Sequence, residues 1–358
     1  MKKMRGATKS SIINYILVIA AYVIVELMIS NGSIKSSLQG QLVPICAYVA
    51  MAVSLNLVVG FSGELSLGHA GFMSVGAFTG VVVAAALQNA IPVGGVRLAL
   101  AMVIGAVFAA LCGLLVGVPV LRLRGDYLAI VTLAFGEIIK NIINIIYIGL
   151  DKNGLQFAFK ESNLNLTEDG VALIKGPMGA VGVTKLATFT AGVILVLVTL
   201  FVVQNLVDSR AGRAIRALRD NRIAAESVGI GVTKYKLMAF VTSAALAGAA
   251  GALYALNYTG VAAKKFDFNT SILILVFVVL GGMGNIRGSI IAATLLTILP
   301  ELLRQFNYDK YRMLVYAIVL IVVMLAVNNS ALMDVVNRVK EKLPGGKPKA
   351  AKGKGGDE

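Results

Sequence analysis

Long apolar runs without a period-two alternation follow one another along the chain. A helix rises about 1.5 Å per residue and the hydrocarbon core of a bilayer is about 30 Å thick, so each run matches one membrane-spanning helix. Backbone groups in that core must be satisfied within helices or closed barrels, and unbroken apolar runs favour helices. The pattern predicts spans at residues 12–29, 42–60, 67–87, 98–118, 127–148, 187–207 and 238–258.

The apolar stretch from 271 to 299 is too long for one span, because a single helix of that length would measure about 44 Å. Its centre reads Gly281-Gly282-Met283-Gly284-Asn285-Ile286-Arg287-Gly288. Glycine weakens a helix, and an arginine at the bilayer midplane costs about 3 kcal/mol on insertion scales. We therefore predict a break with two short spans, 271–283 and 289–303, and a last span at 313–330. The expected fold class is an all-α polytopic membrane protein of about ten transmembrane helices, within a range of eight to ten.

Composition and charge agree with a membrane location. The chain is 58% hydrophobic and only 14% charged, with a mean hydropathy of +0.83, whereas a soluble domain has about a quarter charged residues. The formal net charge is +15, and the lysines and arginines lie between the apolar runs, which indicates membrane orientation and anionic lipid rather than nucleic acid. With the N-terminus inside, most of them fall on the predicted inner segments. Both termini are therefore predicted to be cytoplasmic.

The pattern of hydropathy and charge divides the chain into three parts. A basic cytoplasmic tail at 1–11 precedes a transmembrane domain at 12–330, and a tail rich in lysine and glycine follows at 331–358. The tail is expected to be disordered and held near anionic lipid. Two longer connections stand out within the transmembrane domain: an outer loop at 149–185 and a basic inner loop at 208–237.

The sequence lacks the residue patterns that several kinds of binding and catalytic sites require. The chain has no G-x-x-x-x-G-K-[ST] pattern, so we expect no nucleotide cofactor bound by this chain. The only histidine is His69, which excludes a metal site built on histidines. No nucleophile–histidine–acid set is present, and a membrane enzyme is the weaker hypothesis.

The segment from Gly60 to Phe72, between two spans, is rich in glycine and serine. Non-helical backbone at membrane depth survives only where it is buried in protein or lines a cavity. One interpretation is a broken element on a translocation path; the other is a tight turn at the cytoplasmic face, its polar residues satisfied by neighbours. A second glycine interruption lies later in the chain, and paired interruptions indicate a substrate route in transporters built from repeats. The candidates for the path are Gly63, Glu64, Ser66, His69, Gly71, Gly281, Gly282 and Gly284.

Two charged residues, Glu137 and Lys140, fall inside the predicted span 127–148. Their i, i+3 spacing places them on one helix face, where they can pair. Charge within a membrane is expensive, so Glu137 is a further candidate for the path, with a structural ion pair as the alternative.

The inner loop carries an arginine at every third position from Arg210 to Arg222. The pattern predicts a short amphipathic helix, a turn near Asp220-Asn221 and a second short helix that ends at Gly229. An apolar face is expected from Ile215, Leu218, Ala225 and Val228. Such an element either docks in a partner's groove or lies on lipid head groups.

Four fragments in order, SGELSLGHAGFMSVGAF (62–78), LRLRGDYLAIVTLAFGEIIK (121–140), GRAIRALRDNRIAAESVGI (212–230) and LGGMGNIRGS (280–289), resemble the permease subunits of branched-chain amino-acid ABC transporters, the LivM type. The resemblance implies a homologous permease as a heterodimeric partner, two cytoplasmic ATP-binding subunits that use the ATP, and an extracytoplasmic substrate-binding protein. It also implies that 213–229 couples to an ATPase, through Arg213, Arg216, Arg219, Asp220, Arg222, Glu226 and Gly229.

The function that this resemblance implies is import of branched-chain amino acids across a prokaryotic inner membrane. Permeases for urea and short-chain amides are similar, so those substrates are the alternative. An ion-coupled secondary transporter is a third hypothesis, in which Glu64, Glu137 or His69 carries a proton or an ion.

Overall fold

The computed structural model describes residues 2–32, 35–121, 127–151, 154–160, 164, 170–305, 317–318 and 321. The chain divides into two compact units, residues 1–301 and residues 302–358. The first unit holds the described strands and helices, except that the last helix runs on to Gln305. Apart from residues 317, 318 and 321, the predicted span at 313–330 and the predicted tail at 331–358 lie outside the described residues.

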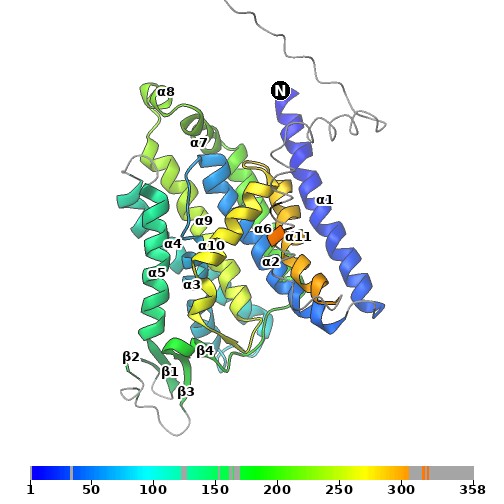
Figure 1. The fold of residues 1–358 in the computed structure, drawn as a ribbon, viewed down its shortest axis with the longest axis vertical. Helices are drawn as coiled ribbons and strands as arrows, with labels where there is room; N and C mark the ends of the chain where they lie inside the picture. Colours follow the sequence, from blue (N-terminus) through cyan, green and yellow to red (C-terminus); the bar gives the residue numbers. More distant parts are fainter. Residues whose placement is uncertain are drawn as a thin grey trace, which may run out of the picture. The chain divides into compact units, whose positions relative to one another are not determined.

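Helices make up most of the first unit (Figure 1). They are α1 (Lys2–Ser30), α2 (Ser36–Asn56) with a π-helical extension η1 (Leu57–Ser62), α3 (His69–Ala86), α4 (Gly94–Val120), α5 (Tyr127–Ile145), α6 (Phe189–Asp208), α7 (Arg210–Asp220), α8 (Arg222–Ser227), α9 (Val232–Ala255), α10 (Phe268–Gly281) and α11 (Ile286–Gln305). Among the described residues, seven segments are long and apolar enough to cross a membrane: Ser11–Ser30 of α1, α2 with η1, α3, α4, α5, α6 and α9. These seven match the first seven predicted spans.

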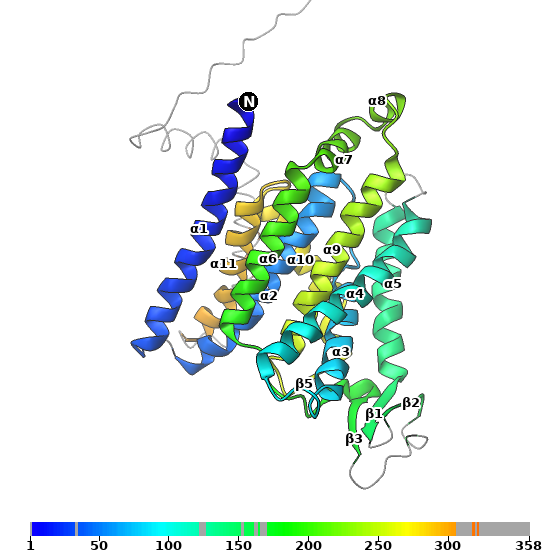
Figure 2. The same ribbon diagram turned by 180° about the vertical axis from the view of Figure 1, so that it is seen from behind.

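The centre of the unit is the packing of α3, α4 and α9 (Figure 2). Their backbones approach closely because glycines face one another: a Cβ on Gly76 would lie 2.0 Å from the carbonyl oxygen of Gly248. Small residues at such contacts are the usual way in which helices associate in a membrane, where no hydrophobic effect drives them together. Against this centre α2 packs on α6 and α9, and α1 packs on α6.

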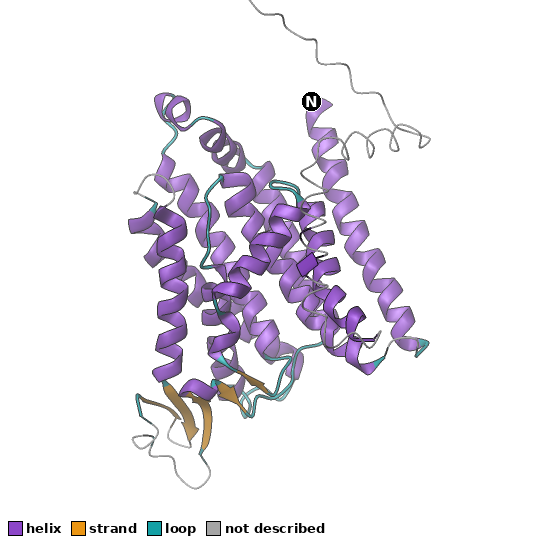
Figure 3. Cartoon of the chain, viewed as in Figure 1, coloured by secondary structure: helices purple, strands orange, loops and turns teal. Residues whose placement is uncertain are grey.

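The expectation of an all-α chain is wrong in one region (Figure 3). Five short strands form one sheet in the order β2-β1-β3-β4-β5, namely β2 (Gly154–Ala158), β1 (Tyr147–Asp151), β3 (Val171–Lys175), β4 (Ala180–Val181) and β5 (Gly260–Val261). Tyr147 pairs antiparallel with both Ala158 and Lys175, so helix α5 ends at Ile145 and does not reach residue 148. The predicted outer loop therefore contains strands of a sheet, whose ladders satisfy backbone groups within it.

The strands and the pair α7–α8 lie at opposite ends of the long helices, as Figures 1 and 2 both show. We call these the sheet end (β1–β5) and the basic end (α7 and α8). The predicted short amphipathic helix, the turn and the second short helix are confirmed as α7, a cap at Asn221, and α8.

Two helices extend beyond the predicted membrane spans for a common reason. Helix α9 begins at Val232, not at 238, so the last residues of the predicted inner loop 208–237 are helical. Helix α2 likewise begins at Ser36, six residues before its apolar run. Hydropathy marks where a helix meets lipid, but the hydrogen-bonded helix continues into polar sequence once it has formed. The break in the long apolar stretch is confirmed, since α10 ends at Gly281 and α11 begins at Ile286.

Candidate functional site

The segment between α2 and α3 is broken, as the glycine-rich sequence predicts. The α2 helix continues as π-helical turns to Ser62 and ends at Gly63, whose φ of 73° is the left-handed conformation that favours glycine. Non-helical backbone then runs to Gly68, where a Cβ would lie 1.8 Å from the carbonyl oxygen of Thr132. Leu67 donates its N–H to the Thr132 hydroxyl at 3.1 Å. The irregular backbone is thus packed against the middle of α5.

Burial gives His69 and its neighbours a packing role. The His69 side chain is 2% exposed, and its Nε2 lies 2.9 Å from Ser54 Oγ on α2. The Ser54 hydroxyl also lies 2.9 Å from the Met51 carbonyl oxygen, so the buried imidazole and hydroxyl both have polar partners. Ser66 is also buried, and a Cβ on Gly71 would lie 2.8 Å from the Cα of Gly136. A place for these residues on a path stays a prediction.

Glu64 forms an ion pair with Lys236 of α9. The two side chains are only 18% and 11% exposed, so the pair is shielded from solvent. A carboxylate that loses its partner in such surroundings is costly, which makes the pair a firm attachment of the broken segment to α9. Glu64 is therefore held in a fixed position near the basic end.

The two glycine interruptions lie directly against each other. Gly284, with a φ of 80°, donates its N–H to Asn56 Oδ1 at 2.8 Å. The Asn56 amide donates in turn to Ser289 Oγ at 2.9 Å, and Asn56 is fully buried. A Cβ on Gly60 would lie 2.3 Å from the Gly284 nitrogen, so only glycine allows this approach. Two segments that are far apart in sequence thus share one buried amide.

A side chain of α7 completes this contact. Arg219 Nη1 donates to the carbonyl oxygen of Gly60 at 2.5 Å. The stem of Arg219 also covers Gly63, where a Cβ would lie 2.7 Å away, and a Cβ on Gly284 would lie 3.6 Å from Nη1. We call the set Asn56, Gly60, Gly63, Arg219 and Gly284 the junction. It brings together three residues predicted from three separate motifs: Gly63 and Gly284 as path candidates, and Arg219 as a coupling residue.

The other coupling residues divide into inward and outward groups. Arg216 donates to the Val207 carbonyl at 2.8 Å and fastens α7 to the end of α6, whereas Arg213 and Asp220 are exposed. Arg222 pairs locally with Glu226 at 3.0 Å within α8. The row of arginines therefore does not act as one face.

The apolar face of α7 and α8 is mostly as predicted. Ile215 is 1% exposed, and Leu218 and Ala225 form a small cluster with Val232 at the start of α9. Val228 is the exception, because it is 76% exposed. It follows α8 directly, where Gly229 turns the chain with a φ of 83°, and so it points away from the cluster.

Glu137 lies apart from the junction. It pairs with Lys140 on α5, as the i, i+3 spacing predicts, and the two side chains are 36% and 21% exposed. It lines a narrow space with Gly71 and Asp267. The structure thus separates Glu137 from Glu64, and the two carboxylates do not form one site.

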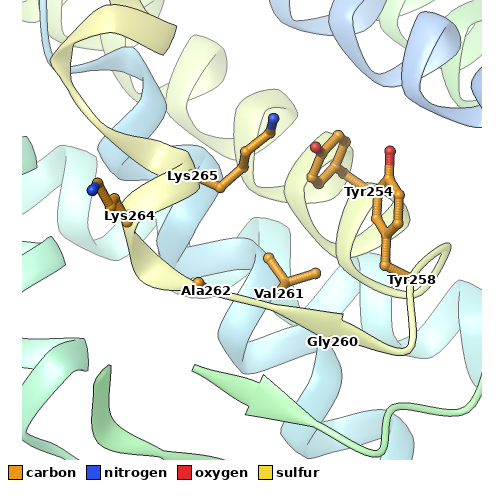
Figure 4. Close-up of a pocket in the computed structure, with 7 residues that line it drawn as sticks. All are labelled: Tyr254, Tyr258, Gly260, Val261, Ala262, Lys264 and Lys265. Atoms are coloured by element: carbon orange, nitrogen blue, oxygen red, sulfur yellow. The ribbon is translucent and has the colours of Figure 1, made fainter. Parts of the chain in front are cut away.

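A pocket that the sequence did not reveal opens at the sheet end (Figure 4). Its volume is about 430 Å³, and its lining is Tyr254, Tyr258, Gly260, Val261, Ala262, Lys264 and Lys265. The rings of Tyr254 and Tyr258 lie 5.1 Å apart, and Figure 4 shows their hydroxyls and the Lys265 ammonium pointing the same way. Burial raises the pKa of the Tyr258 hydroxyl, which therefore stays a neutral donor. Lys264 points away from the two rings.

Sequence reasoning missed this pocket because its residues come from a connection between spans. The run Tyr254–Lys265 reads as a helix end followed by a loop, and only the tertiary fold turns it back on itself. Asn56 was also missed, although an amide inside an apolar run was the available signal.

Comparison with known proteins shows which proteins this chain is similar to. A family model described as branched-chain amino acid transport system / permease component matches residues 38–324. The chain is 36% identical to the high-affinity branched-chain amino acid transport system permease protein LivM of Salmonella typhimurium, over 83% of this chain and 69% of that protein. It is 38% identical to the LivM protein of Escherichia coli, over 78% of this chain and 66% of that protein.

A shorter match joins the chain to a second permease of the same kind. The high-affinity branched-chain amino acid transport system permease protein LivH of Escherichia coli is 33% identical over 33% of this chain and 38% of that protein. The chain spans about two thirds of the length of the LivM relatives. No solved structure matches.

Proposed function

The chain belongs to the family of permease components of branched-chain amino acid transport systems, and on that premise we propose that it carries the translocation path of an ATP-driven importer and couples it to separate ATPases. It is a multi-pass protein of the inner membrane. The observation that carries the proposal is the bond from Arg219 to the Gly60 carbonyl, because it joins the amphipathic pair α7–α8 directly to both broken segments.

The junction supplies a physical route for coupling. When ATP binding draws two ATPases together, a force on α7 and α8 reaches Gly60 through Arg219 and reaches Gly284 through Asn56. Broken helices bend at such points more easily than continuous ones, since no ladder of i→i−4 bonds must be broken. The movement switches the path between outward-facing and inward-facing states.

The outward surface of α7 and α8 fits a protein partner better than lipid alone. Ile223 on α8 and Val228 just after it are 80% and 76% exposed, and Arg210 and Arg213 on α7 are exposed as well. Two exposed apolar side chains and exposed cations on this pair of helices match a groove with an apolar floor and an acidic rim. We assign one of the two ATP-binding subunits to this surface and the homologous permease as the second path-forming chain, in line with the matches to both LivM and LivH.

The orientation follows from charge. The basic end holds Arg210, Arg213 and their neighbours, so it lies at the cytoplasmic face under the positive-inside rule. The N-terminus of α1 lies at the same end in Figures 1 and 2. Ten spans, a cytoplasmic C-terminus and a lipid-bound tail at 331–358 complete this arrangement.

The sheet-end pocket suits the receipt of an apolar amino acid from a substrate-binding protein. The Lys265 ammonium matches a carboxylate, and the faces of Tyr254 and Tyr258 match an aliphatic side chain. A neutral urea or amide offers no carboxylate, so this pocket favours the amino acid over those alternatives.

Lysine 265 gives the sharpest test of the pocket. Because the binding protein sets the affinity of the importer, Lys265→Gln is expected to lower the maximal uptake rate of leucine about tenfold with little change in the half-saturating concentration. Lys264→Gln removes the neighbouring ammonium, which points away, and is the matched control. Equal uptake rates for the two variants would refute the role of the pocket.

Reconstitution tests the function as a whole. The chain, a second permease, the two ATPases and the binding protein are placed in liposomes, with ATP inside and labelled leucine or urea outside. We expect accumulation of leucine only when ATP and every subunit are present. Accumulation by this chain alone, driven by an ion gradient, would establish a secondary transporter instead, and accumulation of urea in place of leucine would establish the amide importer.

A further inference from the structure

A second polar pocket, of about 270 Å³, lies at the basic end between α1, α6, α7 and α11. Its lining is Ser11, Asn14, Phe61, Gln204, Val207, Asp208, Arg216, Gly284, Asn285, Ile286 and Arg287. We propose that this pocket binds the phosphate head group of an anionic membrane phospholipid. Neither the coupling residues nor the substrate pocket requires such a site, so the proposal does not depend on the transported substrate.

The buried amide of Gln204 is the first reason. Gln204 is 5% exposed and lines the pocket, and neither its Oε1 nor its Nε2 has a hydrogen-bond partner among the described residues. Leaving a buried polar group unsatisfied costs about 1–3 kcal/mol, so native proteins rarely keep one without a ligand. The Nε2 group of this amide can donate to a phosphate oxygen, and Oε1 can accept from a head-group hydroxyl.

The charge of the lining is the second reason. Arg216 and Arg287 contribute two guanidinium groups against one carboxylate, that of Asp208. The guanidinium of Arg216 has five N–H donors, of which its bonds to the Val207 and Gly212 carbonyls use two. Arg287 Nε donates to Asn14 Oδ1 at 2.6 Å and so holds its guanidinium beside the same wall. Guanidinium groups pair well with the oxygens of a phosphodiester, which carries one negative charge.

The position of the pocket selects a lipid rather than a free anion. Helix α1 forms one wall, and large apolar side chains along it are exposed, as on a lipid-facing helix: Ile12, Ile16, Ile19, Val23, Ile24 and Leu27. On the neighbouring α6, Ile194, Val198 and Phe201 are also exposed. Acyl chains can therefore lie along both helices below a head group held at the basic end, where the inner leaflet begins.

The pocket also touches the coupling apparatus. Gly284 belongs to the junction, and Arg216 fastens α7 to α6, yet both line the pocket. A lipid phosphate held by Arg216 and Gln204 would bridge α6, α7 and the turn before α11. The expected consequence is a more stable basic end in membranes that contain the anionic lipid.

The test compares thermal unfolding of the full-length chain in neutral detergent with added phosphatidylglycerol, phosphatidylcholine or inorganic phosphate. Phosphatidylglycerol is expected to raise the Tm of the wild-type protein by several degrees, and the other two are not. Gln204→Leu removes the unpartnered amide, so its Tm without lipid is expected to equal or exceed that of the wild type, while its gain with phosphatidylglycerol is lost. Ser74→Ala is the matched control, because it removes another buried unpartnered polar atom outside the pocket and is expected to keep the full gain.

Gln204→Glu keeps the shape of the side chain, and its ionised carboxylate repels phosphate while remaining compatible with the two arginines. It is expected to weaken binding of phosphatidylglycerol at least tenfold, measured by titration of the Tm shift. A folded Gln204→Glu or Gln204→Leu protein that retains the wild-type gain would overturn the proposal. An equal gain with phosphatidylcholine would also overturn it, and a full gain with inorganic phosphate alone would show a site for a free anion instead.

Discussion

Replacement of Arg219 by alanine tests the junction most directly. Its bond to the Gly60 carbonyl has a charged donor, for which a contribution of about 1.5–3 kcal/mol is typical. The side chain is 44% exposed, so solvent screening reduces this value to about 1–2 kcal/mol. Part of the effect arises because Gly60 lies in the last turn of a helix, where carbonyl groups lack helical partners and attract a cation.

That free energy sets the expected loss of coupling. About 1.4 kcal/mol corresponds to a factor of ten, so Arg219→Ala is expected to lower leucine uptake about tenfold in reconstituted vesicles. Under the proposed function the variant keeps the outward surface of α7 and α8 for the ATPases, so ATP hydrolysis is expected to continue. The number of ATP molecules hydrolysed per leucine imported is therefore expected to rise about tenfold.

The matched variant is Arg213→Ala on the same helix. Arg213 is exposed, and its side chain has no hydrogen-bond or ion-pair partner among the described residues, so its loss leaves the junction intact. If it contacts an ATPase, the variant weakens assembly of the complex but leaves the ATP cost per leucine unchanged in the complexes that do form. An unchanged ATP cost in Arg219→Ala vesicles with normal assembly would refute the coupling role of the junction.

Further predictions concern stability, measured as free energy of unfolding or Tm in detergent. Gly76→Ala places a methyl group against the Gly248 carbonyl and is expected to lower the free energy of unfolding by about 3 kcal/mol. Gly40→Ala is the control, because a Cβ there has no atom within 4 Å, and it is expected to be neutral or stabilising. Equal effects of the two variants would contradict the packing argument. Glu64→Gln and Lys236→Met are each expected to lower the free energy of unfolding by about 2–3 kcal/mol. The loss in the double variant is expected to be smaller than the sum of the two single losses by about 1–2 kcal/mol, and strict additivity would argue against the ion pair. Burial raises the pKa of the Asp267 carboxyl, but hydrogen bonds from the Thr270 N–H and the Asn269 amide outweigh burial and lower the pKa below 3.8. The stability that the ionised carboxylate provides is therefore present above about pH 4 and is lost as the pH falls through the lowered pKa. Asp267→Asn is expected to flatten that acid dependence of the Tm, and an unchanged acid profile would exclude this cap as its source.

Much of the fold could be predicted because membrane insertion imposes a length and a composition on each segment. The seven spans, the break between Gly281 and Ile286 and the two short helices at 210–227 follow from local pattern alone. The sheet was not predicted, because β4 and β5 have two residues each and β5 pairs only with β4, a strand distant in the chain. Strands so short carry no periodic signal of their own.

By itself, the sequence determined that this protein is a bundle of membrane helices with two glycine breaks and a basic inner element, because hydropathy, glycine content and charge act on each segment locally. Only the tertiary structure decided that the breaks meet. Asn56 and Gly284 are 228 positions apart, and Arg219 reaches Gly60 across 159 positions. Which arginine of a regular row points inward depends on the helices packed beside it, and that choice separates Arg219 at the junction from Arg213 at the surface.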